Sequence, residues 1–379
     1  MARIIVCGYM IRHPLAGNVL AFFHYLLGLA RLDHQVCYFE ESGGWQDPCY
    51  DPETRQCGDD PSVGLRTVVN LLTSHGLNVP VCYIHRDTGS TTGMNWPDIR
   101  QNLKEADLLL NIGGLCWLPD FALCRRRALI DMDPFFTQTG RFGGGVLGEH
   151  HAFFSYGANI GRPQCCIPTA GVEWLPTVPP VVADLWENDD IAQDAPFTTI
   201  ATWDAYGTVN YQGESYGQKS EEILRFLELP GRTRWKVELA LAGGYDVRGR
   251  LQGAGWSIRD AGEVSTNVPA YYTYIKNSRG EFSVAKNAYV KTRSGWFSDR
   301  SVCYLAAGLP VILQDTGFSD WLPTGRGLLA FSSLEEAVKC IDAVNTDYAA
   351  HRQAAREMAE KTFDYRVVLP HLLDMACQA

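Results

Sequence analysis

The chain has 379 residues, a length typical of two domains, and its 46% hydrophobic and 20% charged residues are ordinary for a globular enzyme. Its formal net charge is −10 and it has no long basic run, which argues against nucleic acid as the main partner because phosphate neutralisation needs clustered Lys and Arg. The one basic cluster, residues 125–127, is interpreted as a solvated turn before a strand.

Targeting and redox signals point to the cytoplasm. Residues 2–9 form a short apolar strand with one Arg, unlike a secretory signal. No apolar run reaches the roughly 18 residues that a membrane span needs. The twelve Cys form no CxxC pairs, which favours reduced thiols and argues against a zinc site. We therefore expect a cytoplasmic protein with no membrane span and no bound metal.

The first half of the chain alternates short apolar runs with amphipathic stretches, a pattern typical of parallel α/β folds. No GxGxxG follows the first strand, so a dinucleotide site is not supported there. A long loop is predicted at 42–62, where Gly, Pro, Cys and Asp are frequent. The predicted strands are 3–8, 35–40, 80–85, 107–112, 128–132 and 152–155, and the predicted helices are 18–32, 62–75 and 97–106.

A proline-rich stretch at 167–196 has few periodic apolar positions and is typical of a linker. The α/β pattern then restarts. The predicted strands are 197–202, 236–241, 257–260 and 281–285, and the predicted helices are 219–227, 248–253 and 269–278.

Residues 294–317 are the most informative stretch. A loop with Ser and Gly opens an amphipathic helix at 299–307, Gly308 ends it, a strand follows at 309–313, and Asp315-Thr316-Gly317 forms a second loop. Two loops at the carboxyl edge of a parallel sheet, one leading into a helix N-terminus, make an anion site because the N–H groups there are free. We therefore place the diphosphate of a nucleotide at this edge.

The last part of the chain is predicted to be helical. A strand at 328–331 precedes a helix at 333–344, which begins with a capping box formed by Ser333 and Glu336. Residues 347–377 are predicted to be helical with a break near Pro370.

Two motifs resemble the GT-B glycosyltransferases. Residues 306–312 match the AxGxPVI run of their donor domain, and residues 28–36 match the GLAxxGHxV run of their first helix and second strand, with Asp33 in place of the usual Gly. The pattern covers nearly the whole chain. Bacterial sequences described only as glycosyltransferases share further runs, at 282–286, 294–301 and 315–323.

The resemblance implies an α/β fold of two Rossmann-like domains facing across a cleft. It implies transfer of a sugar from an NDP-sugar to an acceptor hydroxyl or amine on a small metabolite, without an essential metal or another cofactor. A homodimer is compatible with it. The expected parts are an acceptor domain, a linker, a nucleotide-sugar domain and a final helix packing back on the first domain, at 1–175, 176–196, 197–360 and 361–379.

The sequence departs from the family pattern at two positions that are linked to the stereochemistry of transfer. Many retaining members carry two Glu eight positions apart, but the corresponding residues here are Gly295 and Cys303. Asp299 lies one helical turn before Cys303 on the same face, so it is a candidate for the missing carboxylate. The alternative is that Asp299 only complements the helix N-terminus.

The donor-side candidates come mostly from this resemblance. A Lys near Lys219 neutralises the donor diphosphate in the family, and an ammonium stabilises the departing diphosphate. For each candidate the alternative is an ordinary surface, turn or core residue. The other candidates are Arg300, Ser301 and the amides around Ser298 for the phosphates, Lys286 at a strand end, Thr316 and Gly317 for the sugar or phosphate, and Trp256 beside the base.

On the acceptor side, His13 follows the first strand, where inverting members often carry a His that acts as a base. Asp133 follows the strand at 128–132 and is expected in the cleft, with Asp131 structural. Asp204 follows the strand at 197–202 and is a candidate for holding a sugar hydroxyl, or else a turn residue. A Gly-rich loop at 143–145 is interpreted as an ordinary exposed loop, and the alternative is a mobile loop that closes over the acceptor.

Two other functions stay open. An NDP-sugar epimerase can share this architecture, with Asp133, Asp204 and Asp299 as its acid and base groups. A non-catalytic sugar-nucleotide-binding protein would keep the fold and lack the carboxylate pair.

Overall fold

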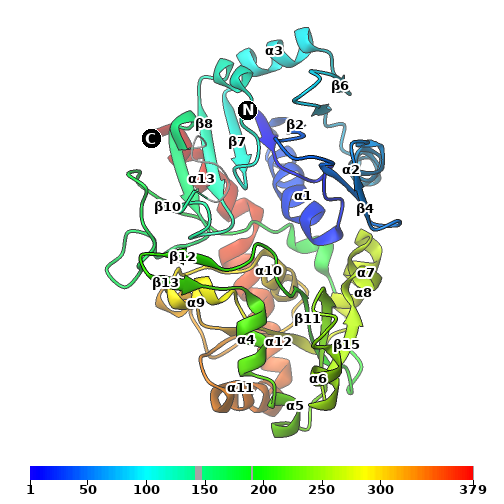
Figure 1. The fold of residues 1–379 in the computed structure, drawn as a ribbon, viewed down its shortest axis with the longest axis vertical. Helices are drawn as coiled ribbons and strands as arrows, with labels where there is room; N and C mark the ends of the chain where they lie inside the picture. Colours follow the sequence, from blue (N-terminus) through cyan, green and yellow to red (C-terminus); the bar gives the residue numbers. More distant parts are fainter. Residues whose placement is uncertain (141–146, 189–190, 379) are drawn as a thin grey trace.

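The computed structural model describes residues 1–140, 147–188 and 191–378, so the Gly-rich residues 143–145 lie outside the described part. The chain forms two α/β halves, the first above the second in Figure 1, each with its own sheet. The two sheets share no hydrogen-bonded strand pair among the described residues. The predicted division into two α/β halves is confirmed.

The N-terminal sheet has eight strands in the order β10-β9-β8-β7-β1-β2-β5-β6, parallel except for β5 with β6. Ile4 of β1 pairs with Val36 of β2 on one side and Leu108 of β7 on the other. The central strands are buried on both faces, which explains their nearly continuous apolar sequences. The strands are β1 (Arg3–Cys7), β2 (Gln35–Glu41), β5 (Val81–Ile84), β6 (Thr91–Thr92), β7 (Leu108–Ile112), β8 (Arg127–Asp131), β9 (Ala152–Ser155) and β10 (Leu175–Pro176).

Helices and short turns connect these strands. The helices are α1 (Ala16–Arg31), α2 (Ser62–Ser74) and α3 (Trp96–Glu105), with 3-10 turns at Pro119–Leu123, Leu147–Glu149 and Ala183–Trp186. The predicted loop at 42–62 was wrong in part, because it contains a hairpin of β3 (Cys49–Asp51) and β4 (Gln56–Gly58). Strands of three residues are too short to give a periodic signal.

The C-terminal sheet is fully parallel, in the order β15-β14-β11-β16-β17-β18. Its strands are β11 (Phe197–Thr202), β14 (Val237–Ala242), β15 (Ser257–Asp260), β16 (Gly280–Ser283), β17 (Val311–Gln314) and β18 (Leu328–Phe331). A separate hairpin of β12 (Val209–Tyr211) and β13 (Glu214–Tyr216), which the sequence did not predict, lies between β11 and the next helix.

Short helices surround this sheet, and one of them begins with one of the two hydrogen bonds of the predicted capping box. The hydroxyl of Ser333 accepts from the N–H of Glu336 at 3.2 Å, but the Glu336 carboxylate accepts from Ser332 rather than Ser333, at 2.7 Å. The helices are α4 (Lys219–Arg225), α5 (Leu229–Arg232), α6 (Arg248–Gly253), α7 (Ala261–Ser265), α8 (Val268–Lys276), α9 (Asn287–Lys291), α10 (Asp299–Ala306), α11 (Leu334–Thr346) and α12 (Tyr348–Met358), with a 3-10 turn at Phe318–Asp320.

The chain ends in α13 (Tyr365–Gln378), which returns to the N-terminal half (red in Figure 1). It packs against α1 so closely that a Cβ on Gly28 would lie 2.7 Å from Leu369. The predicted break near Pro370 was wrong. A π-helical turn at Ala359–Phe363 precedes the break, which falls at Asp364, where the carboxylate accepts from the Arg366 N–H at 2.9 Å.

His24 of α1 fixes the proline-rich segment between the halves. It is 2% exposed, its Nδ1 accepts from the Val182 N–H at 3.2 Å, and its Nε2 lies 3.4 Å from the indole Nε1 of Trp186. Burial lowers the pKa of His24 to about 3. The imidazole is therefore neutral in the folded protein across the working pH range.

This burial predicts a pH-dependent loss of stability. Below pH 6.5 the unfolded chain binds a proton at His24 that the folded chain does not take up until about pH 3. The free energy of unfolding should therefore fall by about 2 kcal/mol between pH 7 and pH 5 through this group alone. Urea unfolding of the wild type and His24→Gln at both pH values measures it. An equal fall in the two proteins would contradict the assignment.

Candidate functional site

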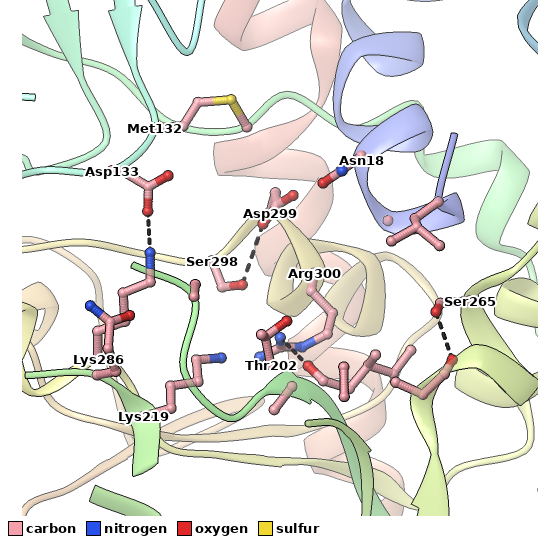
Figure 2. Close-up of a pocket in the computed structure, with 18 of the residues that line it drawn as sticks. Asn18, Met132, Asp133, Thr202, Lys219, Ser265, Lys286, Ser298, Asp299 and Arg300 are labelled. Atoms are coloured by element: carbon pink, nitrogen blue, oxygen red, sulfur yellow. Dashed lines mark hydrogen bonds and ion pairs between the residues drawn. The ribbon is translucent and has the colours of Figure 1, made fainter. Parts of the chain in front are cut away.

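A cavity of about 310 Å³ lies between the carboxyl edges of the two sheets. The N-terminal half lines it with the loop after β1, the start of α1 and the end of β8. The C-terminal half contributes the segments after β11, β14 and β16 and the start of α10. Figure 2 shows side chains of both halves converging on this space. The lining includes Tyr9, Asn18, Met132, Asp133, Thr202, Tyr206, Lys219, Tyr271, Lys286, Trp296, Ser298, Asp299 and Arg300.

The N-terminus of α10 faces the cavity. Ser298 is extended and precedes the helix, and its side chain does not cap the helix. The first N–H groups of a helix have no intrahelical partner and carry a partial positive charge. Ser298, Asp299 and Arg300 all line the cavity, so these N–H groups are placed for an anion. The sequence-based prediction of the helix and its start agrees with the structure.

Arg300 is anchored to the C-terminal sheet. Its Nε donates to the buried Glu281 at 2.7 Å and its Nη2 to the Ser283 hydroxyl at 2.8 Å, while Nη1 donates to the Ile200 carbonyl at 2.6 Å. A guanidinium has five N–H groups, so two have no partner among the described residues. Arg300 is therefore rigidly held, with its charge partly balanced by Glu281.

Lys219 is the first residue of α4 and is only 8% exposed. Among the residues that the structure describes, none forms a hydrogen bond or ion pair with its ammonium. In Figure 2 this ammonium ends in open space between Lys286 and Thr202. Burial lowers the pKa of Lys219 well below its ordinary value, and Arg300 lowers it further, against the opposing effect of Glu281. A buried, unpaired ammonium is unfavourable, and a bound anion would remove this cost.

Asp133 joins the two halves across the cavity. Its carboxylate accepts from the Lys286 ammonium and the Tyr289 hydroxyl, and from the Tyr206 hydroxyl at 2.9 Å. Burial alone would raise the pKa of Asp133, but the charge and hydrogen bond of Lys286, with those two hydroxyls, lower it. Asp133 is therefore ionised at neutral pH. Figure 2 marks its contact with Lys286.

Asp299 is the second carboxylate at the cavity. Burial raises the pKa of Asp299, although the nearby Arg300 acts in the opposite direction. The two positions that hold Glu in many retaining enzymes cannot replace it here. Gly295 has a φ of +73°, and a Cβ there would lie 2.8 Å from Cγ of Asn159, while Cys303 is buried inside α10. Asp299 is thus the carboxylate that α10 presents to the cavity.

The other predicted site residues do not line this cavity. Trp256 is buried and donates its indole N–H to the Leu227 carbonyl at 3.0 Å, which places it in the core behind the sheet. Thr316 donates its hydroxyl to the Trp296 carbonyl at 2.6 Å. Gly317 and the buried Ser301 also lie outside the lining.

Of the three acceptor-side candidates, one lines the cavity and two do not. Asp133 lines the cavity, whereas His13 is exposed and packs between the rings of Tyr9 and Tyr50. Asp204 is also exposed and accepts from the Ser220 hydroxyl. The lining residues that sequence reasoning missed include Tyr9, Asn18, Tyr271 and Trp296. Tyr9 carried a usable signal, because it directly follows the first predicted strand.

Asp131, expected from the sequence to be structural, is held by hydrogen bonds within the N-terminal half. The Asp131 carboxylate is buried and accepts from three side chains, Thr137, Gln138 and Ser155, at 2.6 to 2.8 Å. Within residues 1–140, 147–188 and 191–378, no three His, Cys, Asp or Glu side chains are grouped as metal ligands. In the same residues no helix combines the length and apolar character needed to cross a bilayer.

Comparisons with known proteins agree with this geometry. Residues 232–374 match a family model described as "Glycosyl transferase-like". Over 99% of both chains, the structure is similar to an alpha-glucosyltransferase in complex with UDP-glucose and DNA containing an abasic site, with a TM-score of 0.59 and 10% identity. A comparison with curated proteins finds no match.

Two further solved structures share the fold. Anabaena HepE in complex with UDP and glucose has a TM-score of 0.57 and 12% identity over all of both chains. AviGT4, involved in avilamycin A biosynthesis, has a TM-score of 0.55 and 9% identity over 99% of this chain and 97% of that one. The GT-B fold inferred from the sequence is confirmed.

Proposed function

We propose that this chain, a GT-B glycosyltransferase by its fold and by the family match of its C-terminal part, transfers a sugar from an NDP-sugar to a small acceptor alcohol or amine. One observation carries the proposal: the ammonium of Lys219, unpaired among the described residues and belonging to a side chain that is only 8% exposed, opens onto the same cavity as the N-terminus of α10. A bound diphosphate is a negatively charged partner for both the ammonium and the N–H groups.

The donor diphosphate is bound from the C-terminal side of the cavity. Lys219, Arg300 and the start of α10 surround its oxygens. As the sugar leaves, the nucleoside diphosphate gains negative charge, and fixed positive groups in a partly buried site stabilise that charge. Because these groups supply the positive charge themselves, the scheme needs no metal ion.

The acceptor is bound from the N-terminal side. That wall consists of Tyr9, Leu15, Gly17, Asn18, Met132 and Asp133, with no Lys or Arg. A phosphorylated or nucleic-acid acceptor needs cations along its path, so this wall favours a neutral or amine-bearing small molecule. Asp133 is ionised and within the cavity, and we assign it as the base that takes the acceptor proton.

Binding is tested by a thermal-shift series of UDP, dTDP, GDP and ADP against their nucleosides. At least one diphosphate should raise the melting temperature, because a ligand that binds only the folded state stabilises it by mass action. Its nucleoside should raise the melting temperature far less. Equal shifts for diphosphate and nucleoside would exclude a site organised around the diphosphate.

Two carboxylates in one cavity, Asp133 and Asp299, also fit an NDP-sugar epimerase, which needs an acid and a base around the sugar. Incubation with an NDP-hexose in the absence of acceptor separates the two activities. Isomerised NDP-hexose would favour the epimerase, and freed NDP would favour the transferase. Tight NDP binding without turnover over a panel of acceptors would favour a non-catalytic binding protein.

Asp299 gives a further prediction for the transferase. Asp299→Asn should lower kcat by about tenfold or more if the carboxylate stabilises the sugar or orients its hydroxyls, because the amide keeps the shape and loses the charge. UDP affinity should change little or increase, since a negative charge leaves the phosphate site. Steady-state kinetics and calorimetry measure the two quantities. A wild-type kcat in the variant would indicate that Asp299 only complements the N-terminus of α10 and has no part in turnover.

A further inference from the structure

Asn159 belongs to the N-terminal half but makes its side-chain contacts with the C-terminal half. It follows β9 and is fully buried. Its Nδ2 donates to the carbonyls of Arg293 and Gly317 at 3.1 and 3.0 Å, and lies 3.4 Å from the Asp320 carboxylate. Its backbone N–H donates to the Ser294 carbonyl at 3.0 Å. Asn159 therefore contacts both the loop that precedes α10 and the loop that follows β17.

The two loops leave a space of the right size for this amide because both carry glycine. A Cβ on Gly295 would lie 2.8 Å from Cγ of Asn159, and a Cβ on Gly317 would lie 2.7 Å from its Nδ2. Both glycines also have positive φ, +73° and +90°. Such backbone positions disfavour other residues. The two glycines are thus explained by the approach of Asn159 and by their own turns.

The orientation of the amide is fixed by its surroundings. All three neighbours of Nδ2 are oxygen acceptors, so the NH₂ end must face them. The Oδ1 atom is buried and has no partner among the described residues. The contact therefore depends on hydrogen-bond donation and not on the carbonyl end of the side chain.

The loops that Asn159 holds are joined to each other and to the cavity. The Gly295 N–H donates to the Thr316 carbonyl at 2.8 Å, and the Trp321 indole donates to the Gly295 carbonyl at 3.0 Å. The first loop continues directly into Ser298 and the start of α10, which line the cavity. A displacement of this loop would move the N–H groups that face the donor site.

We propose that Asn159 is a positioning residue that docks both loops on the N-terminal half and thereby holds the start of α10 at the donor site. Asn159 does not line the cavity, so it acts through Ser298, Asp299 and the N–H groups of α10. This role rests on the proposed function for its consequence in donor binding, but the docking itself is a property of the protein without ligand.

The test is Asn159→Asp, which keeps the shape and replaces the donor with a carboxylate facing three oxygens. We expect hydrogen exchange in residues 294–301 and 315–321 of the ligand-free protein to become at least tenfold faster. We also expect the dissociation constant of UDP to rise at least tenfold by calorimetry, at a temperature where circular dichroism shows the variant folded. Gln164→Leu is the matched control, because it removes an exposed contact with Asp320, and it should change neither quantity.

Two outcomes would overturn the proposal: wild-type exchange in both segments, or faster exchange with unchanged UDP affinity, which would indicate a purely structural contact. Failure of the wild type to bind UDP would instead count against the proposed function, and hydrogen exchange would still decide the docking. If Asn159→Asp does not fold, Asn159→Ala takes its place, with the same direction expected in both measurements.

Discussion

Replacing Lys219 with Met is expected to abolish most donor binding while making the ligand-free protein more stable. Lys219 is largely buried and its ammonium has no partner among the described residues, so the wild type pays a desolvation cost that a diphosphate offsets. Met has a similar length and removes this cost, so the melting temperature without ligand should rise. The melting shift caused by UDP should largely disappear, and kcat should fall by about 10²–10³, as for other removed groups that stabilise developing negative charge.

The opposite signs of these two effects distinguish a ligand site from a structural lysine. Lys291→Met serves as the control, because this exposed Lys pairs with Glu214 at 3.2 Å away from the cavity, and both measurements should stay near the wild-type values. A lower melting temperature for Lys219→Met, together with an unchanged shift on UDP addition, would remove Lys219 from the donor site.

Asp133→Asn is expected to have the largest effect on turnover. A positioned general base contributes about 10²–10⁴-fold, and the amide cannot accept the acceptor proton. Because Lys286, Tyr289 and Tyr206 keep the pKa of Asp133 below its ordinary value, the wild-type rate should not decline through this group between pH 8 and pH 5. The variant should lose kcat with little change in the apparent affinity for the donor. Initial rates across this pH range measure both.

Asp342→Asn, at an exposed position of α11, is the control and should leave kcat unchanged. If Asp133→Asn retains wild-type kcat, the base must be another group, and the carboxylate serves only to join the two halves through Lys286. If the variant instead loses donor binding to the same extent as turnover, its defect lies in the cleft geometry rather than in proton transfer.

Local sequence signals located the backbone of the site. The pattern of apolar runs placed β11, β18 and α10 within a residue or two, because buried parallel strands give short continuous apolar runs whereas an amphipathic helix gives a periodic pattern. Lys219 and Asp299 were found because each begins a predicted helix and because the family resemblance points to these segments, and Arg300 was found because it follows Asp299 in the same motif. Asp133 was found because it follows β8.

Side-chain partners could not be predicted in the same way. Asp133 and Lys286 are 153 residues apart, and no local pattern indicates that they meet. The indole N–H is the one polar group of the Trp256 side chain. It donates to the carbonyl of Leu227, which lies in a different segment, so the sequence did not indicate that Trp256 is a core residue. His13 has the sequence position of a family base, but the loop after β1 turns its ring towards Tyr50 instead of the cavity. These outcomes depend on packing between distant segments.

The most direct test of the account is the structure of a crystal soaked in UDP. We predict density for the diphosphate in contact with the Lys219 ammonium and the first N–H groups of α10. Density for the diphosphate at any other place on the protein, with the space beside Lys219 still vacant, would contradict it.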